Sequence, residues 1–147
     1  NASPNSGNVE YRMHLVDTSV WIEFLRPSGS PEIQRRLKPL IQTGTIALTE
    51  WIILELMTGL RTTEQAKALL AQLAPVHRLS LPEDGWPKAW DLAARLRKKG
   101  ITPSAADCLI ATVAATHAAT LIHCDFDFEL IAQPAGMKTI NWIALLS

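Results

Sequence analysis

Hydrophobic positions along this chain follow two patterns: short runs typical of strands, and longer stretches with a helical period. The short runs, each bounded by polar or turn residues, predict strands at residues 13–16, 45–48, 76–81, 120–123 and 137–140. Apolar residues three and four positions apart predict helices at residues 20–25, 31–43, 50–58, 62–74, 84–99, 105–115 and 129–132. Strands that alternate with helices are typical of a parallel sheet covered on both faces. We therefore expect a three-layer α/β/α fold with a central parallel sheet of four to five strands.

The predicted helix at residues 50–58 is apolar almost all round, which predicts that it is buried. Glu55 is the only charged residue in the run from Trp51 to Met57. A carboxylate in such surroundings is costly unless it is paired, protonated or bound to a cation. Two interpretations stay open. Glu55 either forms an ion pair with Arg61 or faces a hydrated groove, or it holds a cation together with other acids.

The tryptophans follow the helical period. In the predicted helix at residues 84–99 that period places Trp86 and Trp90 on the inner face with Leu96. Stacking on nucleobases is the alternative use of an aromatic ring. We interpret most of the five tryptophans as core or interface residues: Trp21, Trp51, Trp86, Trp90 and Trp142.

The 147 residues are enough for one domain with a sizeable core, and 48% of them are hydrophobic. Residues 1–12 are polar and without periodicity, so we interpret them as a flexible extension or an expression remnant and assign the domain to residues 13–147. No stretch is long and apolar enough for a membrane helix. Cys108 and Cys124 lack the spacing of a zinc or redox pair, so we expect free thiols in a reducing cytoplasm.

Fourteen basic and fourteen acidic residues cancel, so the chain has no overall cationic field that would attract nucleic acid. Basic residues are clustered instead, at positions 35–38 and 95–99. We interpret each cluster first as a solvated helix face, with a phosphate-binding surface as the alternative.

Acidic residues stand where the predicted strands end. Asp17 directly follows the first strand and Asp125 follows the fourth, and the carboxyl ends of parallel strands meet at one edge of a sheet. Asp107 lies in the first turn of a predicted helix that Ser104 caps. Capping or dipole compensation explains Asp17 and Asp107 when each is taken alone. Together with Glu55, however, the topology predicts that these acids converge.

Four carboxylates in one crevice repel each other unless a cation neutralises them. Hard oxygen ligands suit Mg²⁺ or Mn²⁺, and such an ion can activate water and stabilise charge on phosphate oxygens. The chain has no Gly-rich phosphate loop, and the set of acids includes no lysine or histidine as a covalent nucleophile. The chemistry that fits best is metal-assisted hydrolysis of a phosphodiester.

Four blocks of the sequence resemble, in order, the motifs of PIN-domain nucleases. They are residues 17–22 (DTSVWI), 55–61 (ELMTGLR), 104–111 (SAADCLIA) and 123–128 (HCDFDF). The nearest branch of that family is the VapC-type toxins of bacterial toxin–antitoxin pairs. The resemblance implies a parallel sheet flanked by helices, a Mg²⁺- or Mn²⁺-dependent endoribonuclease that uses metal-activated water, a homodimer, and a cognate VapB-like antitoxin as inhibitor.

The resemblance also implies roles for individual residues. The metal-binding and catalytic acids become Asp17, Glu55, Asp107 and Asp125. Ser19 is expected to support Asp17 or water on the metal. Asp127 is the alternative to Asp125 as the fourth ligand, and we expect it to cap the following helix instead. His123 is interpreted as a structural or outer-shell group rather than a general base. Local cations are expected to hold the RNA phosphates: Arg61, Arg95, Arg97, Lys98 and Lys99.

Other functions stay open on the sequence alone. An Asp after the first strand also opens haloacid-dehalogenase-like phosphatases, but those usually carry a second Asp where this chain has Ser19. A non-catalytic domain that holds a cation in an acidic pocket is a further alternative. A housekeeping RNA-processing PIN nuclease is the nearest neighbour of the toxin hypothesis.

Overall fold

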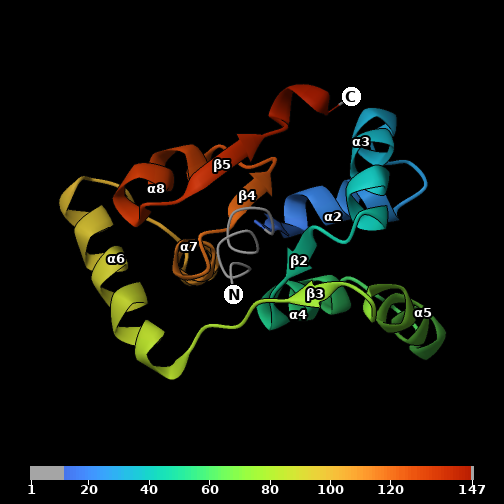
Figure 1. Ribbon diagram of the computed structural model, residues 1–147, viewed down its shortest axis with the longest axis horizontal. Helices are drawn as coiled ribbons and strands as arrows, with labels where there is room; N and C mark the ends of the chain where they lie inside the picture. Colours follow the sequence, from blue (N-terminus) through green and yellow to red (C-terminus); the bar gives the residue numbers. More distant parts are fainter. Residues whose placement is uncertain (1–11, 147) are drawn as a thin grey trace, which may run out of the picture.

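Five parallel strands form the central sheet of the computed structural model, which describes residues 12–146 (Figure 1). Their bounds are β1 His14–Val16, β2 Ile46–Leu48, β3 His77–Arg78, β4 Thr120–His123 and β5 Lys138–Asn141. The strand order is β3-β2-β1-β4-β5, so the chain leaves the central strand β1 first toward one edge and later toward the other. This reversal makes the carboxyl ends of β1 and β4 the place where an open α/β sheet forms its binding crevice.

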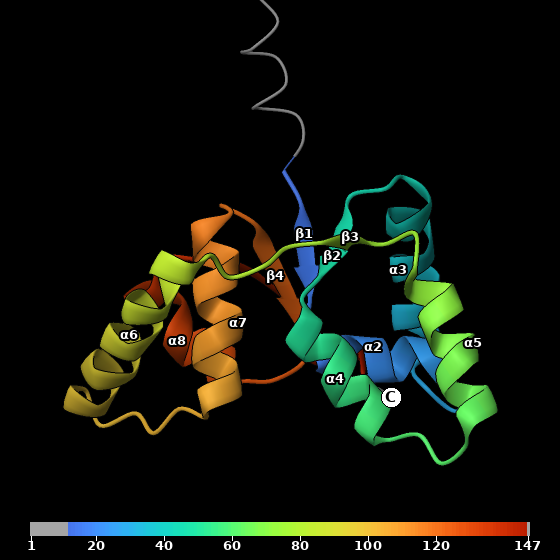
Figure 2. The same cartoon turned by 90° about the horizontal axis from the view of Figure 1, so that it is seen from below.

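Helices cover both faces of the sheet, which confirms the predicted three-layer α/β/α architecture. They are α2 Thr18–Leu25, α3 Pro31–Gln42, α4 Glu50–Thr58, α5 Thr63–Leu73, α6 Trp86–Lys98, α7 Ala105–Thr116 and α8 Asp127–Ala135, with 3₁₀ turns η1 Glu83–Gly85 and η2 Ile143–Leu145. Helices α6, α7 and α8 gather on one side of the sheet and α2, α3 and α5 on the other (Figures 1 and 2). Figure 2 also shows α4 and the start of α7 at the end of the molecule where the strands finish.

Hydroxyl residues begin several of these helices, as the sequence predicts. Thr49 accepts a hydrogen bond from the backbone of Ile52 at the start of α4, and Ser104 accepts one from Asp107 at the start of α7. Such caps satisfy backbone donors that have no partner inside the helix. They fix where α4 and α7 begin, and therefore where the acids they carry lie.

Two elements differ from the prediction. Strand β3 covers only His77–Arg78 rather than residues 76–81, because it is an edge strand that pairs with β2 alone and the chain then leaves the sheet toward Pro82. Helix α8 is longer than the predicted 129–132. It runs from Asp127 to Ala135 and ends at Gly136, whose φ of 71° favours glycine.

The prediction that Trp86 and Trp90 face inward is wrong. Their side chains are 45% and 66% exposed, and α6 instead buries Ala89, Leu92 and Leu96. Helix α6 lies at the outside of its layer (Figure 1), so only one narrow face of the helix meets α7 and α8.

Helix α4 is likewise not buried all round, contrary to the sequence prediction. Trp51 is 38% exposed and Leu54 is 52% exposed, while Ile52, Ile53 and Leu56 are buried. Helix α4 lies at the open end of the sheet, so its inner face packs on the core and its outer face meets solvent (Figure 2). Of the five tryptophans, Trp21 and Trp142 belong to the core.

No helix in the described part of the chain is long and apolar enough to span a membrane. Residues 1–11 lie outside the described residues, so the interpretation of the N-terminal segment stays a prediction.

Candidate metal centre

Asp17 lies at the junction between β1 and α2 and is only 6% exposed. Its Oδ2 accepts hydrogen bonds from the backbone N–H of Ser19 at 3.0 Å and from the Ser19 hydroxyl at 2.6 Å, so Asp17 is the N-cap of α2. The Ser19 oxygen in turn accepts a bond from the backbone N–H of Cys124 at 3.0 Å. Asp17 can therefore cap α2 and belong to the acidic site at the same time. Ser19 connects the end of β1 to the loop after β4.

Glu55 reaches the same region from α4. The hydroxyl of Thr18 donates a hydrogen bond to Glu55 Oε1 at 2.5 Å. No ion pair between Glu55 and Arg61 forms in the described part of the chain. The cost of a partly buried carboxylate is met by a neutral donor, which leaves the negative charge in place.

Three further acids form a cluster at the carboxyl edge of the sheet. Asp107 comes from the first turn of α7, Asp125 from the loop after β4, and Asp127 from the start of α8. One oxygen of each lies within 4.8 Å of the others. The arrangement offers hard oxygen donors close enough together to share one divalent cation.

Electrostatics connects this cluster with the acids on the other side of β1. Burial, followed by the charges of Asp125, Asp17 and Asp127, raises the pKa of Asp107 to about 6, although Ser104 lowers it. Burial is also the main cause that raises the pKa of Asp17; bonds from Ser19 oppose that shift, and the charge of Glu55 adds to it. The structure therefore brings all five predicted acids into one mutually repulsive group.

The structure differs from the expectation for Asp127 and keeps both Asp125 and Asp127 as candidates for the fourth ligand. The prediction that Asp127 caps α8 is wrong, because the backbone N–H of Asp127 donates to Asp125 Oδ1 at 3.0 Å. Asp127 is the first residue of the helix, and its carboxylate is free to join the cluster.

The described structure assigns structural roles that the sequence left unspecified. Thr18 holds Glu55; its place next to Asp17 was the only signal for that role. Glu129 was not predicted as part of the site, yet its Oε2 lies 2.6 Å from His123 Nε2. Burial, and to a smaller extent the charges of Glu23 and Asp17, raises the pKa of the Cys124 thiol to about 11, so the nearby sulfur stays protonated and oxygen atoms dominate the site.

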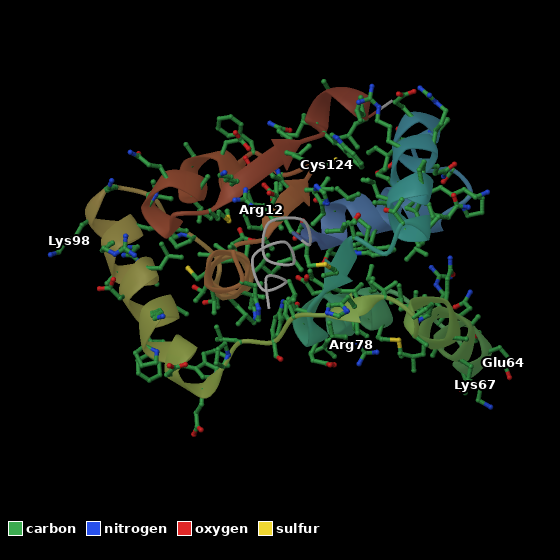
Figure 3. All side chains as sticks on the ribbon, viewed as in Figure 1. Arg12, Glu64, Lys67, Arg78, Lys98 and Cys124 are labelled. Atoms are coloured by element: carbon green, nitrogen blue, oxygen red, sulfur yellow. The ribbon has the colours of Figure 1, made fainter. Side chains whose placement is uncertain are left out.

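The cations expected to bind RNA fall into two groups. Arg95 is engaged by the protein itself, through Asp91 at 2.7 Å and the carbonyl of Pro134 at 2.8 Å. The others have exposed side chains: Arg61, Arg97, Lys98 and Lys99. The α4–α5 connection, which carries Arg61, and the α6–α7 connection lie at the same end of the molecule as the start of α7 (Figure 2). The side chain of Lys98 points away from the molecule at the end of α6 (Figure 3).

The chain matches the PIN domain family model over residues 14–134. It is 30% identical over 135 residues to Ribonuclease VapC11 of Mycobacterium tuberculosis, covering 88% of this chain and 99% of that protein. It is 31% identical over 116 residues to Ribonuclease VapC21 of the same species, covering 77% and 83%. The chain therefore belongs to the PIN domain family, in the branch of the VapC ribonucleases.

Solved structures share the fold of this chain. The structure of VapBC2 from Rickettsia felis bound to a promoter DNA fragment superposes with a TM-score of 0.74 at 20% identity, over 88% of this chain and 98% of that one. FitAcB from Neisseria gonorrhoeae superposes with a TM-score of 0.73 at 25% identity, over 88% and 97%.

Proposed function

We propose that this protein is a divalent-metal-dependent endoribonuclease that acts as the toxin of a toxin–antitoxin pair. The observation that carries the proposal is the group of five acids at the carboxyl edge of the sheet, three of which have oxygens within 4.8 Å of one another. The membership of the VapC branch supports RNA as the substrate. The two free cysteines of this chain, Cys108 and Cys124, suit a reducing cytoplasm.

The residues present fit Mg²⁺ or Mn²⁺, because they offer carboxylate oxygens whose mutual repulsion a divalent charge relieves. Such an ion, when bound, would activate water and stabilise charge on the phosphate. Ser19 orients Asp17, and Thr18 orients Glu55. The pKa of Asp107 is raised to about 6, so protonation of this carboxylate would compete with metal binding as the pH falls toward 6 and below.

An apolar groove between α2, α4 and α5 suits the antitoxin. It has a volume of about 510 Å³ and is lined by Ile22, Leu25, Arg26, Leu56, Gly59, Leu60, Gln65, Leu69 and Gln72. Ile22 is 42% exposed, so apolar surface is open to a partner. We place here an amphipathic segment of a VapB-like antitoxin with its apolar face in the groove, since the structural neighbours include VapBC complexes.

A second apolar surface suits another copy of this chain. Trp51 and Trp86 are exposed and line a hollow of about 290 Å³ between the start of α4, the start of α6 and α7, and Leu54 is exposed three residues after Trp51 on α4. Glu50 and Arg78 form an ion pair on the β3 side of α4, close to this surface. An apolar centre with both charge signs nearby is self-complementary, as an interface around a two-fold axis requires. We therefore propose that the protein forms a homodimer through α4.

The proposed activity is tested by incubating total cellular RNA with the purified chain, with and without Mg²⁺ or Mn²⁺, and mapping the new ends. Asp17→Asn is expected to abolish metal-stimulated cleavage, because it removes one charge at the centre of the acidic group. Asp84→Asn, in the exposed η1 turn, is the matched control and should cleave as the parent does. Cleavage by Asp17→Asn at the parent rate would refute the assignment. Metal binding without any cleavage by the parent would favour the non-catalytic alternative.

A further inference from the structure

His123 is fully buried at the end of β4 and makes polar contacts with both of its ring nitrogens. Nδ1 lies 3.1 Å from the backbone nitrogen of Asp125. Nε2 lies 2.6 Å from Glu129 Oε2, and that same oxygen accepts a bond from the Thr139 hydroxyl at 3.0 Å. The imidazole therefore joins the end of β4, the loop that carries Asp125, the first turns of α8, and β5.

One neutral tautomer of His123 satisfies both contacts. A backbone N–H is always a donor, so Nδ1 must be the acceptor in its contact with Asp125. The ring hydrogen is then on Nε2, where it is donated to the carboxylate of Glu129. The ring also packs against Phe128, with centroids 5.4 Å apart, which fixes its orientation in the core.

These contacts hold the segment that carries two of the clustered acids. Asp125 is held through its backbone by His123, and its Oδ1 accepts the bond that starts α8 at Asp127. Glu129, two residues further on, holds the same helix against His123 and β5. Asp125 and Asp127 repel Asp107, so without this support the loop is free to relax away from α7.

We propose that His123 is a positioning residue that sets the affinity for the divalent cation by holding Asp125 and Asp127 against Asp107. This inference rests on the proposed function, since it assigns His123 a role in the same acidic site. The imidazole acts through the acceptor that Nδ1 offers to the backbone N–H of Asp125, and Glu129 holds the tautomer that leaves Nδ1 free to accept. His123 does not contact the reacting groups.

Two substitutions test the hydrogen bonds of the two ring nitrogens of His123 separately. His123→Asn places a carboxamide oxygen near the position of Nδ1 and removes the hydrogen bond to Glu129. His123→Gln places its polar end near the position of Nε2 and removes the acceptor for the Asp125 N–H. Each variant lacks one hydrogen bond of the parent, so the thermal unfolding temperature of the metal-free protein should be lowered to a similar degree in both.

The deciding measurement is a Mn²⁺ titration of the full chain, followed by the electron paramagnetic resonance signal of free Mn²⁺. His123→Gln should bind Mn²⁺ about 10- to 100-fold more weakly than the parent, the usual effect of removing an outer support of a metal site. His123→Asn should bind as the parent does. Equal Mn²⁺ affinities for the two variants would overturn the proposal.

Hydrogen exchange on the metal-free parent gives a readout that does not depend on either variant folding. The Asp125 amide should be protected by its bond to Nδ1, and an Asp125 amide that exchanges at the rate of an unstructured loop would also overturn the proposal. RNA cleavage by the parent is measured in parallel. Mn²⁺ binding that differs as expected, with no cleavage by the parent, would refute the nuclease and leave the role of His123 supported.

Discussion

At the residue scale, the acidic group is held in place by neutral donors. Ser19 supports Asp17, Thr18 supports Glu55, and no basic side chain pairs with either acid in the described structure. Neutral hydrogen bonds fix the position of a carboxylate without cancelling its charge. The negative charge therefore remains available for a cation, at some cost to the stability of the metal-free protein.

Asp107 should show this cost directly. Its pKa of about 6 lies above its ordinary value of 3.8, so the folded protein binds this proton more tightly than the unfolded chain does. The stability that this group contributes is present below about pH 4 and is lost as the pH rises through about 6. In a chelator at pH 7, Asp107→Asn should therefore raise the free energy of unfolding by about 1 kcal/mol, after allowing for solvent screening of a partly exposed carboxylate.

Chemical denaturation at pH 7 and at pH 4, with chelator or with Mn²⁺, measures this effect. The gain for Asp107→Asn should shrink at pH 4, and the stabilisation of the parent by Mn²⁺ should be reduced or absent in the variant. A variant that is less stable than the parent in chelator at pH 7 would contradict the predicted repulsion.

Thr18→Val tests the support of Glu55. The substitution keeps the shape of the side chain and removes the donor, so RNA cleavage should fall by about tenfold, in the range seen for outer supports of metal sites. Thr58→Val is the matched control, because the Thr58 hydroxyl bonds only the backbone carbonyl of Glu55 at the end of α4. Similar rates for the two variants would mean that the Thr18 bond does not matter for activity.

At the scale of elements, α2 and α4 each divide their apolar residues between the core and solvent. Helix α4 buries Ile52 and Leu56 and exposes Leu54, and α2 buries Trp21 and exposes Ile22. Isolated exposed apolar residues are ordinary, but here Ile22 lines one hollow, and Trp51, three residues before Leu54 on α4, lines a separate one. The two surfaces are therefore expected to serve different partners.

Leu54→Glu and Ile22→Glu should separate these partners. Leu54→Glu is expected to give a monomer in light scattering after size exclusion, because a charge would be buried at the two-fold interface. Ile22→Glu should stay dimeric and lose capture of a VapB-like antitoxin on co-expression. Loss of both properties in both variants would show that the two surfaces are not independent, and Leu70→Glu on the exposed side of α5 controls for general effects of charge.

At the scale of the whole molecule, the charges balance in total but not in place. Acids gather at the carboxyl ends of β1 and β4, while Arg61 and the cations at the end of α6 belong to connections at the same end of the molecule (Figure 2). Such a layout lets phosphates reach the centre along a rim of cations although the net charge is zero.

Charge reversal at this rim should weaken RNA binding. The double variant Lys98→Glu/Lys99→Glu should bind RNA more weakly, and its dependence on salt concentration should be shallower by about 0.7 for each phosphate that the variant no longer neutralises. Lys67→Glu is the control, since Lys67 lies on α5 at the far end of the molecule from Lys98 (Figure 3). Fluorescence anisotropy with a metal-free protein and a labelled single-stranded RNA measures both variants, and equal weakening in the two would argue against a track at α6.

The sequence by itself determined the succession of strands and helices along the chain, the helix caps Thr49 and Ser104, and the presence of acids directly after β1 and β4. These features depend on the chemistry of neighbouring residues and on the periods of strand and helix, which the sequence contains directly. It also limited the chemistry, because carboxylates at the switch point of a parallel sheet point to a divalent cation.

Only the tertiary structure decided which side chains meet across distant segments. Three contacts depend on distances set by the packing of α6 against α7 and α8 and of α8 against β5: the bond from the Asp127 N–H to Asp125, the engagement of Arg95 by Pro134, and the contact of Glu129 with His123. The same holds for the exposed faces of α4 and α6, because an apolar residue is buried only where another element covers it. A helical period predicts which residues share a face, but the neighbours of that face follow from the fold.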